Sequence, residues 1–145
     1  MANTLDYTVD GFGGIKEVIA IACSDETTAL TAAVAKATFR MPYAFTLTAV
    51  RASVTTAPTD APIIVDINEK VGTPSPDVPT SILSTKLWIE ATEFTSTSAT
   101  ASPEHVAVIS DASLADDSEI TIDIDQIGST VAGAGLKVYL IGTRT

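Results

Sequence analysis

Cysteine, aromatic residues and positive charge are all scarce in this chain of 145 residues, and each scarcity excludes a class of protein. One cysteine, Cys23, allows no internal disulfide and no paired-cysteine zinc or redox motif. Eight basic residues against 18 acidic ones give a net charge of −10, which argues against nucleic-acid and membrane partners. No apolar run approaches the roughly 20 residues of a membrane-spanning helix. Because the first residues lack a signal-peptide pattern, we expect synthesis in the cytoplasm.

Short runs that alternate between apolar and polar residues are what the chain does contain. In residues 119–125, Ile120, Ile122 and Ile124 share one face, and polar side chains occupy the other. A period of two predicts a half-buried strand. Further strands are predicted at residues 15–23, 34–41, 45–54, 63–67, 81–84, 86–89, 106–109 and 135–143. With the short runs merged, about eight strands predict an all-β fold, an antiparallel β-sandwich of jelly-roll type.

The chain divides into a polar segment at residues 1–14 and a single domain at residues 15–145. The segment ends in Gly-Phe-Gly-Gly and is interpreted either as an N-terminal arm or as a frayed terminus. If it is an arm, its apolar residues are candidates for contact with a neighbouring subunit; these are Leu5, Tyr7, Val9 and Phe12.

A long connection at residues 69–80 is the second candidate contact. It holds Pro74, Pro76 and Pro79, and prolines are incompatible with the interior of a sheet. We therefore predict no regular structure between residues 68 and 80. On its length alone, this loop offers Val71 and Val78 as contact residues.

Seven stretches carry distinctive packing and turn patterns. They are ACSDETTAL at 22–30, FRMPYAFTLTAVRAS at 39–53, IVDIN at 64–68, SILSTK at 81–86, VISD at 108–111, LADD at 114–117 and ITIDIDQIG at 120–128. Together they resemble a group of small structural proteins from the virions of tailed bacteriophages. The resemblance implies a β-sandwich or jelly-roll module that decorates a capsid or forms part of a tail or fibre.

Clustered aspartates raise the question of a calcium site. Asp116 and Asp117 lie in an acidic turn, and Asp123 and Asp125 lie about 7 Å apart on one face of a predicted strand. Carboxylates at this density could bind Ca²⁺, although the spacing matches no EF-hand loop. A solvated strand face, on which like charges discourage edge pairing, explains the same pattern. We favour the solvated face.

Two further groups could carry chemistry. His105, the single histidine, could form a catalytic pair with Cys23, but no GxSxG nucleophile elbow is present and Cys23 lies in an apolar run typical of a core. Trp88 and Tyr43 could stack on sugar rings, or they could simply pack in the core. We favour a surface histidine and packed aromatic rings, and therefore expect neither an enzyme nor a cofactor.

The expected function is structural. The sequence and the resemblance together favour a capsid decoration protein that binds the major capsid protein on the outer surface of the virion. We expect a homo-oligomer, a dimer or a trimer. The alternatives are a tail or fibre component for host attachment, with or without a glycan-binding tip, and an isolated carbohydrate-binding module.

Overall fold

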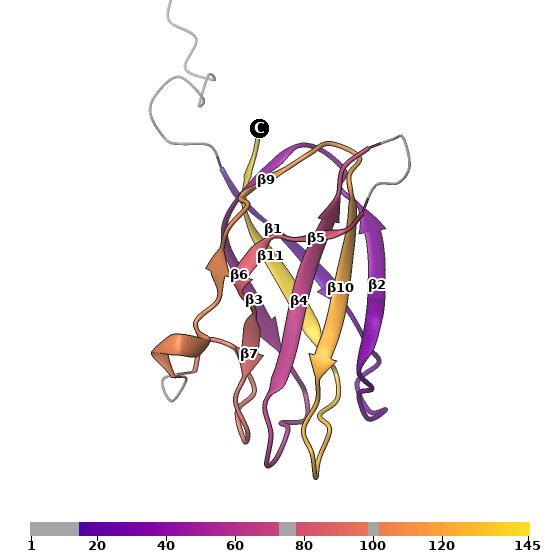
Figure 1. The fold of residues 1–145 in the computed structure, drawn as a ribbon, viewed down its shortest axis with the longest axis vertical. Coiled ribbons are helices and arrows are strands. Elements are labelled where there is room, and N and C mark those ends of the chain that lie inside the picture. The colour runs from indigo at the N-terminus through magenta and orange to yellow at the C-terminus, as the bar shows by residue number, and fades with distance from the viewer. Residues whose placement is uncertain (1–14, 73–77, 99–101) are drawn as a thin grey trace, which may run out of the picture.

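Eleven strands and one short 3-10 helix form the regular structure in the computed structural model, which describes residues 15–72, 78–98 and 102–145 (Figure 1). The long strands are β1 (Lys16–Ala22), β2 (Ala33–Arg40), β3 (Phe45–Ser53), β4 (Ile63–Lys70), β10 (Glu119–Gln126) and β11 (Lys137–Arg144). The short elements are β5 (Thr80–Ser81), β6 (Leu83–Thr85), β7 (Leu87–Ile89), η1 (Pro103–His105), β8 (Val108–Ile109) and β9 (Ser113–Leu114).

The strands form two main antiparallel sheets in a jelly-roll order. The first sheet runs β1-β11-β3-β9, and the second runs β2-β10-β4-β5, with β7 also paired to β4. The first strand thus pairs with the last, and the second strand pairs with the next to last, which is how a jelly roll wraps. A small third sheet joins β6 to β8. The prediction of an antiparallel β-sandwich of jelly-roll type is confirmed.

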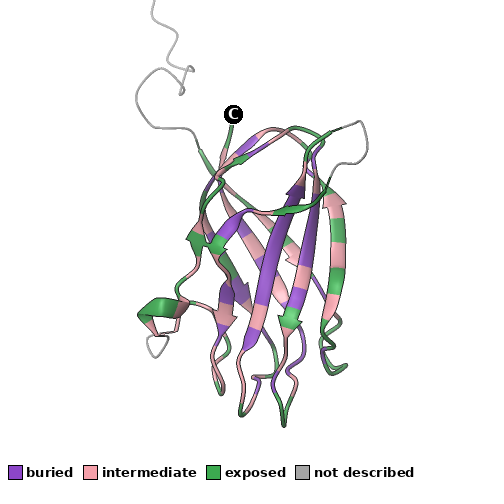
Figure 2. Cartoon of the chain, in the orientation of Figure 1, coloured by how far each residue is buried: buried purple, intermediate pink, exposed green. Residues whose placement is uncertain are grey.

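Alternation explains most strands, and β4 is the exception. On β10 the predicted apolar face is buried, because Ile120, Ile122 and Ile124 are at most 2% exposed. On β4 six of eight residues are buried, and both faces are covered (Figure 2). The unbroken apolar run at the start of β4 accounts for burial on both faces.

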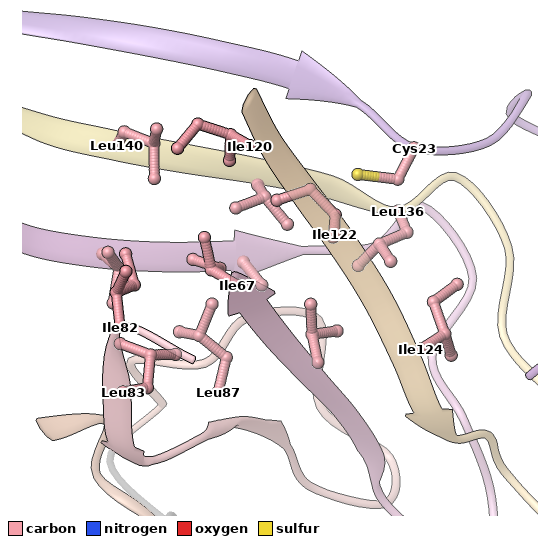
Figure 3. Packing of buried hydrophobic residues seen from close by; sticks show 14 of the residues in the cluster. Cys23, Ile67, Ile82, Leu83, Leu87, Ile120, Ile122, Ile124, Leu136 and Leu140 are labelled. Carbon is pink, nitrogen blue, oxygen red and sulfur yellow. The ribbon is translucent and has the colours of Figure 1, made fainter. Parts of the chain in front are cut away.

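Aliphatic side chains from both sheets fill the space between the layers (Figure 3). Leu136 and Leu140, from the β11 segment, meet Ile120 and Ile122 of β10 within one cluster of buried residues. Cys23 belongs to the same cluster at 5% exposure, and its burial raises the pKa of the thiol to about 11. The prediction of a core cysteine is confirmed.

Two predicted irregular segments contain strand. Asn68 and Glu69 continue β4 as far as Lys70, and β5 begins at Thr80, so the prediction of no regular structure between residues 68 and 80 was wrong at both ends. The acidic turn at residues 111–118 likewise contains β9. The physical reason for the extension of β4 is that Asn68 and Glu69 are buried with hydrogen-bond partners, Asp123 and the backbone of Ala115, which outweighs their low strand propensity.

Candidate functional site

One end of the sandwich gathers exposed aliphatic side chains. The start of β1, the end of β4 and the end of β11 all lie at this end, the upper one in Figure 1. Ile15 precedes β1 and is 74% exposed, and Val71 and Val78 lie in the described part of the β4–β5 connection and are 58% and 68% exposed. We call this the contact end, defined by these three residues.

The two valines border a shallow hollow at the contact end. Its volume is about 410 Å³, and Thr80 and Asp111 also contribute to its lining. The carboxylate of Glu69, which lines the same hollow, accepts the backbone N–H of Ala115 at 2.8 Å. That acid is therefore used internally, and the hollow offers mainly aliphatic and hydroxyl surface to a partner.

The structure bears differently on the two groups of predicted contact residues. Val71 and Val78 are exposed at the contact end, as a partner contact requires. Leu5, Tyr7, Val9 and Phe12 lie outside the described residues, but the chain enters the domain at Ile15 on the same end. The two predicted contact segments therefore adjoin one end of the molecule, which the sequence alone did not indicate.

His105, the single histidine, is part of an aromatic stack rather than a loop free in solvent. Its ring lies 3.8 Å from that of Trp88, with only 7° between the two planes. Its Nδ1 also forms a hydrogen bond with the carboxylate of Glu90. Cys23 lies in the core cluster at the end of β1, so the structure does not bring it together with this histidine. The contacts seen for His105 anchor η1 against β7.

The aromatic residues proposed as sugar platforms each have one ring face occupied. Trp88 is half-buried on β7, and His105 covers one face of its indole. Tyr43 is half-buried as well, and the guanidinium of Arg144 lies 3.9 Å from the centre of its ring. A sugar would have to use the opposite face of either ring or displace these neighbours.

The four aspartates predicted as calcium candidates have separate surroundings. Asp123 accepts the N–H of Ala35 at 2.6 Å and the side-chain amide of Asn68 at 3.0 Å. Asp125 lies 2.5 Å from the ammonium of Lys86. The other two, Asp116 and Asp117, lie between β9 and β10. Across the described ranges, no three acidic, histidine or cysteine side chains are placed to hold a metal ion together.

Lys86 joins two strands of the second sheet, and the sequence analysis missed it. Its ammonium contacts Asp66 at 3.1 Å as well as Asp125, and these carboxylates raise its pKa, with the Asp125 hydrogen bond as the largest cause. Asp66 is 6% exposed and also accepts the Ser81 hydroxyl at 2.5 Å. An aspartate inside an apolar run is the signal that predicts a buried partner, but it does not identify which cation supplies the charge.

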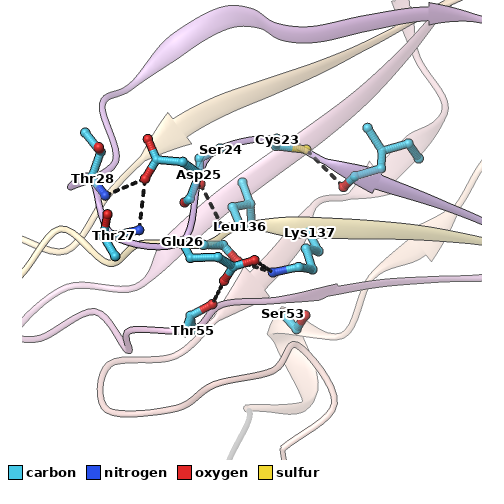
Figure 4. Close-up of polar contacts among 12 residues, drawn as sticks. Cys23, Ser24, Asp25, Glu26, Thr27, Thr28, Ser53, Thr55, Leu136 and Lys137 are labelled. Atoms are coloured by element: carbon cyan, nitrogen blue, oxygen red, sulfur yellow. Dashed lines mark hydrogen bonds and ion pairs between the residues drawn. The ribbon is translucent and has the colours of Figure 1, made fainter.

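The loop after β1 is held by a second group of carboxylates (Figure 4). Asp25 accepts the backbone N–H groups of Thr28 at 2.6 Å and Thr27 at 2.9 Å, and these bonds lower its pKa to about 2. Glu26 bonds to Lys137 and to Thr55, which lowers its pKa as well. Asp25 therefore stabilises the turn within this loop, and Glu26 ties the loop to Lys137 of the first sheet.

Comparisons with protein-family models, with curated proteins and with solved structures found no match. Within the part of the chain that the structure describes, no helix is both long enough and apolar enough to cross a membrane.

Proposed function

We propose that this chain is a structural protein of a virus particle that decorates the outer surface of the capsid. The observation that carries the proposal is the contact end, the end of the sandwich at which Ile15, Val71 and Val78 expose large aliphatic side chains and at which the chain enters the domain. Full burial of one such side chain contributes about 1.5–3 kcal/mol. Burial of these side chains against the major capsid protein would therefore contribute to the affinity of this chain for the capsid.

The mechanism is attachment by shape at several points. A shell presents many identical sites, so each contact needs only modest affinity once neighbouring contacts raise the effective concentration. A homo-oligomer, a dimer or a trimer, would place two or three contact ends on the shell together. With a net charge of −10, the decoration protein needs a docking surface that is apolar or basic rather than acidic.

Two further arguments support a structural subunit. The jelly roll occurs widely in viral capsid domains, although it also occurs in lectins and cupins, so this support is an analogy of fold. The sequence resemblance to virion proteins of tailed bacteriophages points to the same class. Among the described residues, Asp25, Glu69 and Asp125 use their carboxylates for contacts within the fold, as is expected of a structural subunit.

The position on the particle is tested by cryo-electron microscopy of virions from the virus that encodes the chain, together with a count of its copies. We expect hundreds of copies on the outer shell. A few copies confined to the tail would contradict decoration and would favour a tail or fibre component that attaches to the host.

The contact end is tested by co-sedimentation of the purified protein with empty capsids. The double variant Val71→Asp/Val78→Asp places charges on the contact end and should abolish binding. A matched control is Val106→Asp/Val108→Asp, because these valines are 54% and 48% exposed, but Val106 directly follows η1 and Val108 lies in β8. The control should bind like the unmodified protein; equal loss in both variants would show that the contact end has no special role.

A further inference from the structure

The edges of the two main sheets differ in how they are protected. In the described residues the first sheet ends in β9, which has two residues, and the second ends in β5 and β7, which have two and three. Short edges offer little to a passing strand. On the edge strand β2, the register shifts against β10 and Ala35 adopts a positive φ of 51°, so that edge is irregular.

Among the described strands, β1 is the long edge strand with neither a break in register nor a covering segment. Its seven residues pair with β11 in an unbroken register from Lys16 opposite Thr143 to Ala22 opposite Lys137. The strand contains no proline, and its other side has no partner strand in the described residues. A long, regular edge of this kind is a template for another strand.

The register shows which backbone groups of β1 remain available. Cys23 donates its N–H to Leu136 at 2.8 Å, and these two residues face each other. Because N–H and C=O groups alternate in direction along an antiparallel strand, Ile19 and Ile21 bond toward β11. The backbone groups of Val18, Ala20 and Ala22 then point to the open edge.

The side chains of β1 differ between its two faces. On the outer face Val18 is 56% exposed, and Lys16 makes no ion pair with any described residue. On the inner face Ile19 and Ile21 are only partly buried against the core cluster. Glu17 is neutralised by Arg144 at 3.2 Å, so Lys16 leaves this edge locally positive on a strongly acidic chain.

The N-terminal segment has the complementary pattern. Residues 5–10 read Leu-Asp-Tyr-Thr-Val-Asp, which alternates apolar and polar side chains with a period of two. If this stretch runs antiparallel to β1 with Asp10 opposite Lys16, then Tyr7 falls opposite Ile19 and Leu5 opposite Ile21. The apolar residues then extend the core, and opposite charges meet at the end of the pair.

We propose that residues 4–10 of a second copy add to the open edge of β1 as an antiparallel strand, so that neighbouring copies are joined by their arms. That the added strand comes from a second copy rests on the proposed function, because copies that decorate one capsid lie side by side with their contact ends on the same shell. Each arm leaves its domain at that end, beside the start of a neighbour's β1. Residues 11–14, which connect the proposed strand to the domain, span roughly 14 Å when extended. Exchange of an identical element between copies is a low-cost route to an oligomer.

The experiment is disulfide trapping with purified protein and no capsid. One copy carries Thr8→Cys and the other carries Val18→Cys, at positions that the register places opposite each other. Mixing and mild oxidation should give a covalent dimer that contains one copy of each. A matched control replaces Val18→Cys with Val34→Cys, an exposed valine on β2, and should give no mixed dimer. The native Cys23 is buried and its pKa is about 11, so it reacts slowly.

Two results would overturn the inference. A chain that carries both Thr8→Cys and Val18→Cys, oxidised at low concentration, would form an internal disulfide if the arm covered its own β1. Absence of any disulfide between these positions would show that the arm does not use this edge. As an independent readout, deletion of residues 1–14 should reduce the mass of the oligomer in sedimentation to that of a single chain. Loss of capsid binding with arm exchange intact would instead contradict the proposed function alone.

Discussion

Strands β4 and β1 have nearly the same length and opposite surroundings. Six of the eight residues of β4 are buried, including Asp66, Asn68 and Glu69, whereas no residue of β1 is buried (Figure 2). In β4 the polar groups are satisfied by the chain itself, through Lys86, Asp123 and the backbone of Ala115. In β1 no described strand pairs with the backbone groups of one edge. The polar side chains of β4 thus stabilise the fold, whereas the backbone N–H and C=O groups at the outer edge of β1 have no described partner and are suited to bind another strand.

The largest difference between the two strands should appear when apolar side chains are shortened. Ile67 on β4 is fully buried, so Ile67→Ala should lower the free energy of unfolding by about 2–5 kcal/mol through lost burial and a new cavity. Val18→Ala on β1 should change it by no more than about 0.5 kcal/mol, because that side chain is mostly in water. Urea denaturation of the two variants measures both values. Similar losses would show that the Val18 side chain on the outer face of β1 is buried in solution.

A second difference concerns charge, and the shared partner Lys86 makes a matched pair of variants available. Asp66 is 6% exposed and receives hydrogen bonds from Ser81 and the N–H of Ile67, so Asp66→Ala should cost about 2–3 kcal/mol of stability. Asp125 contacts the same lysine from a side chain that is 37% exposed, and Asp125→Ala should cost about 0–1 kcal/mol. Thermal unfolding in low and in high salt checks this order. A larger loss of stability in Asp125→Ala than in Asp66→Ala would show that the contacts of Asp66 with Lys86 and Ser81 contribute less to stability than the exposed ion pair.

The sequence predicted the long strands well, because their side-chain alternation is a local signal. The run from Ile120 to Ile124 and the apolar start of β4 both gave the correct element and the correct burial. The short strands β5 and β9 were not predicted, since two residues carry no period and their pairing depends on distant strands. The jelly-roll order likewise depends on long-range pairs such as β1 with β11.

The candidate site was predictable only in part. The exposure of Val71 and Val78 followed from their place in a long loop, which needs no knowledge of the fold. The stack of His105 on Trp88 joins residues 17 positions apart through a 3-10 helix that periodicity does not reveal. The position of β1 at the edge of the described sheet was also not predictable, because an edge is defined by which strands pair, and that depends on contacts between distant parts of the chain.

The smallest expected effect concerns the loop that follows β1 and holds its end in place. Hydrogen bonds from the N–H groups of Thr28 and Thr27 lower the pKa of Asp25 to about 2, below the unfolded value of about 3.9. Because the folded pKa is the lower one, this carboxylate stabilises the fold fully above about pH 4 and loses that effect as the pH falls toward 2. Asp25→Asn should therefore make the free energy of unfolding fall less steeply between pH 4 and pH 2. Glu104→Gln on the exposed helix η1 is the control and should leave the slope unchanged. An equally steep fall in Asp25→Asn would mean that other carboxylates, such as Glu17 and Glu26 with their lowered pKa values, account for the acid sensitivity of this part of the first sheet.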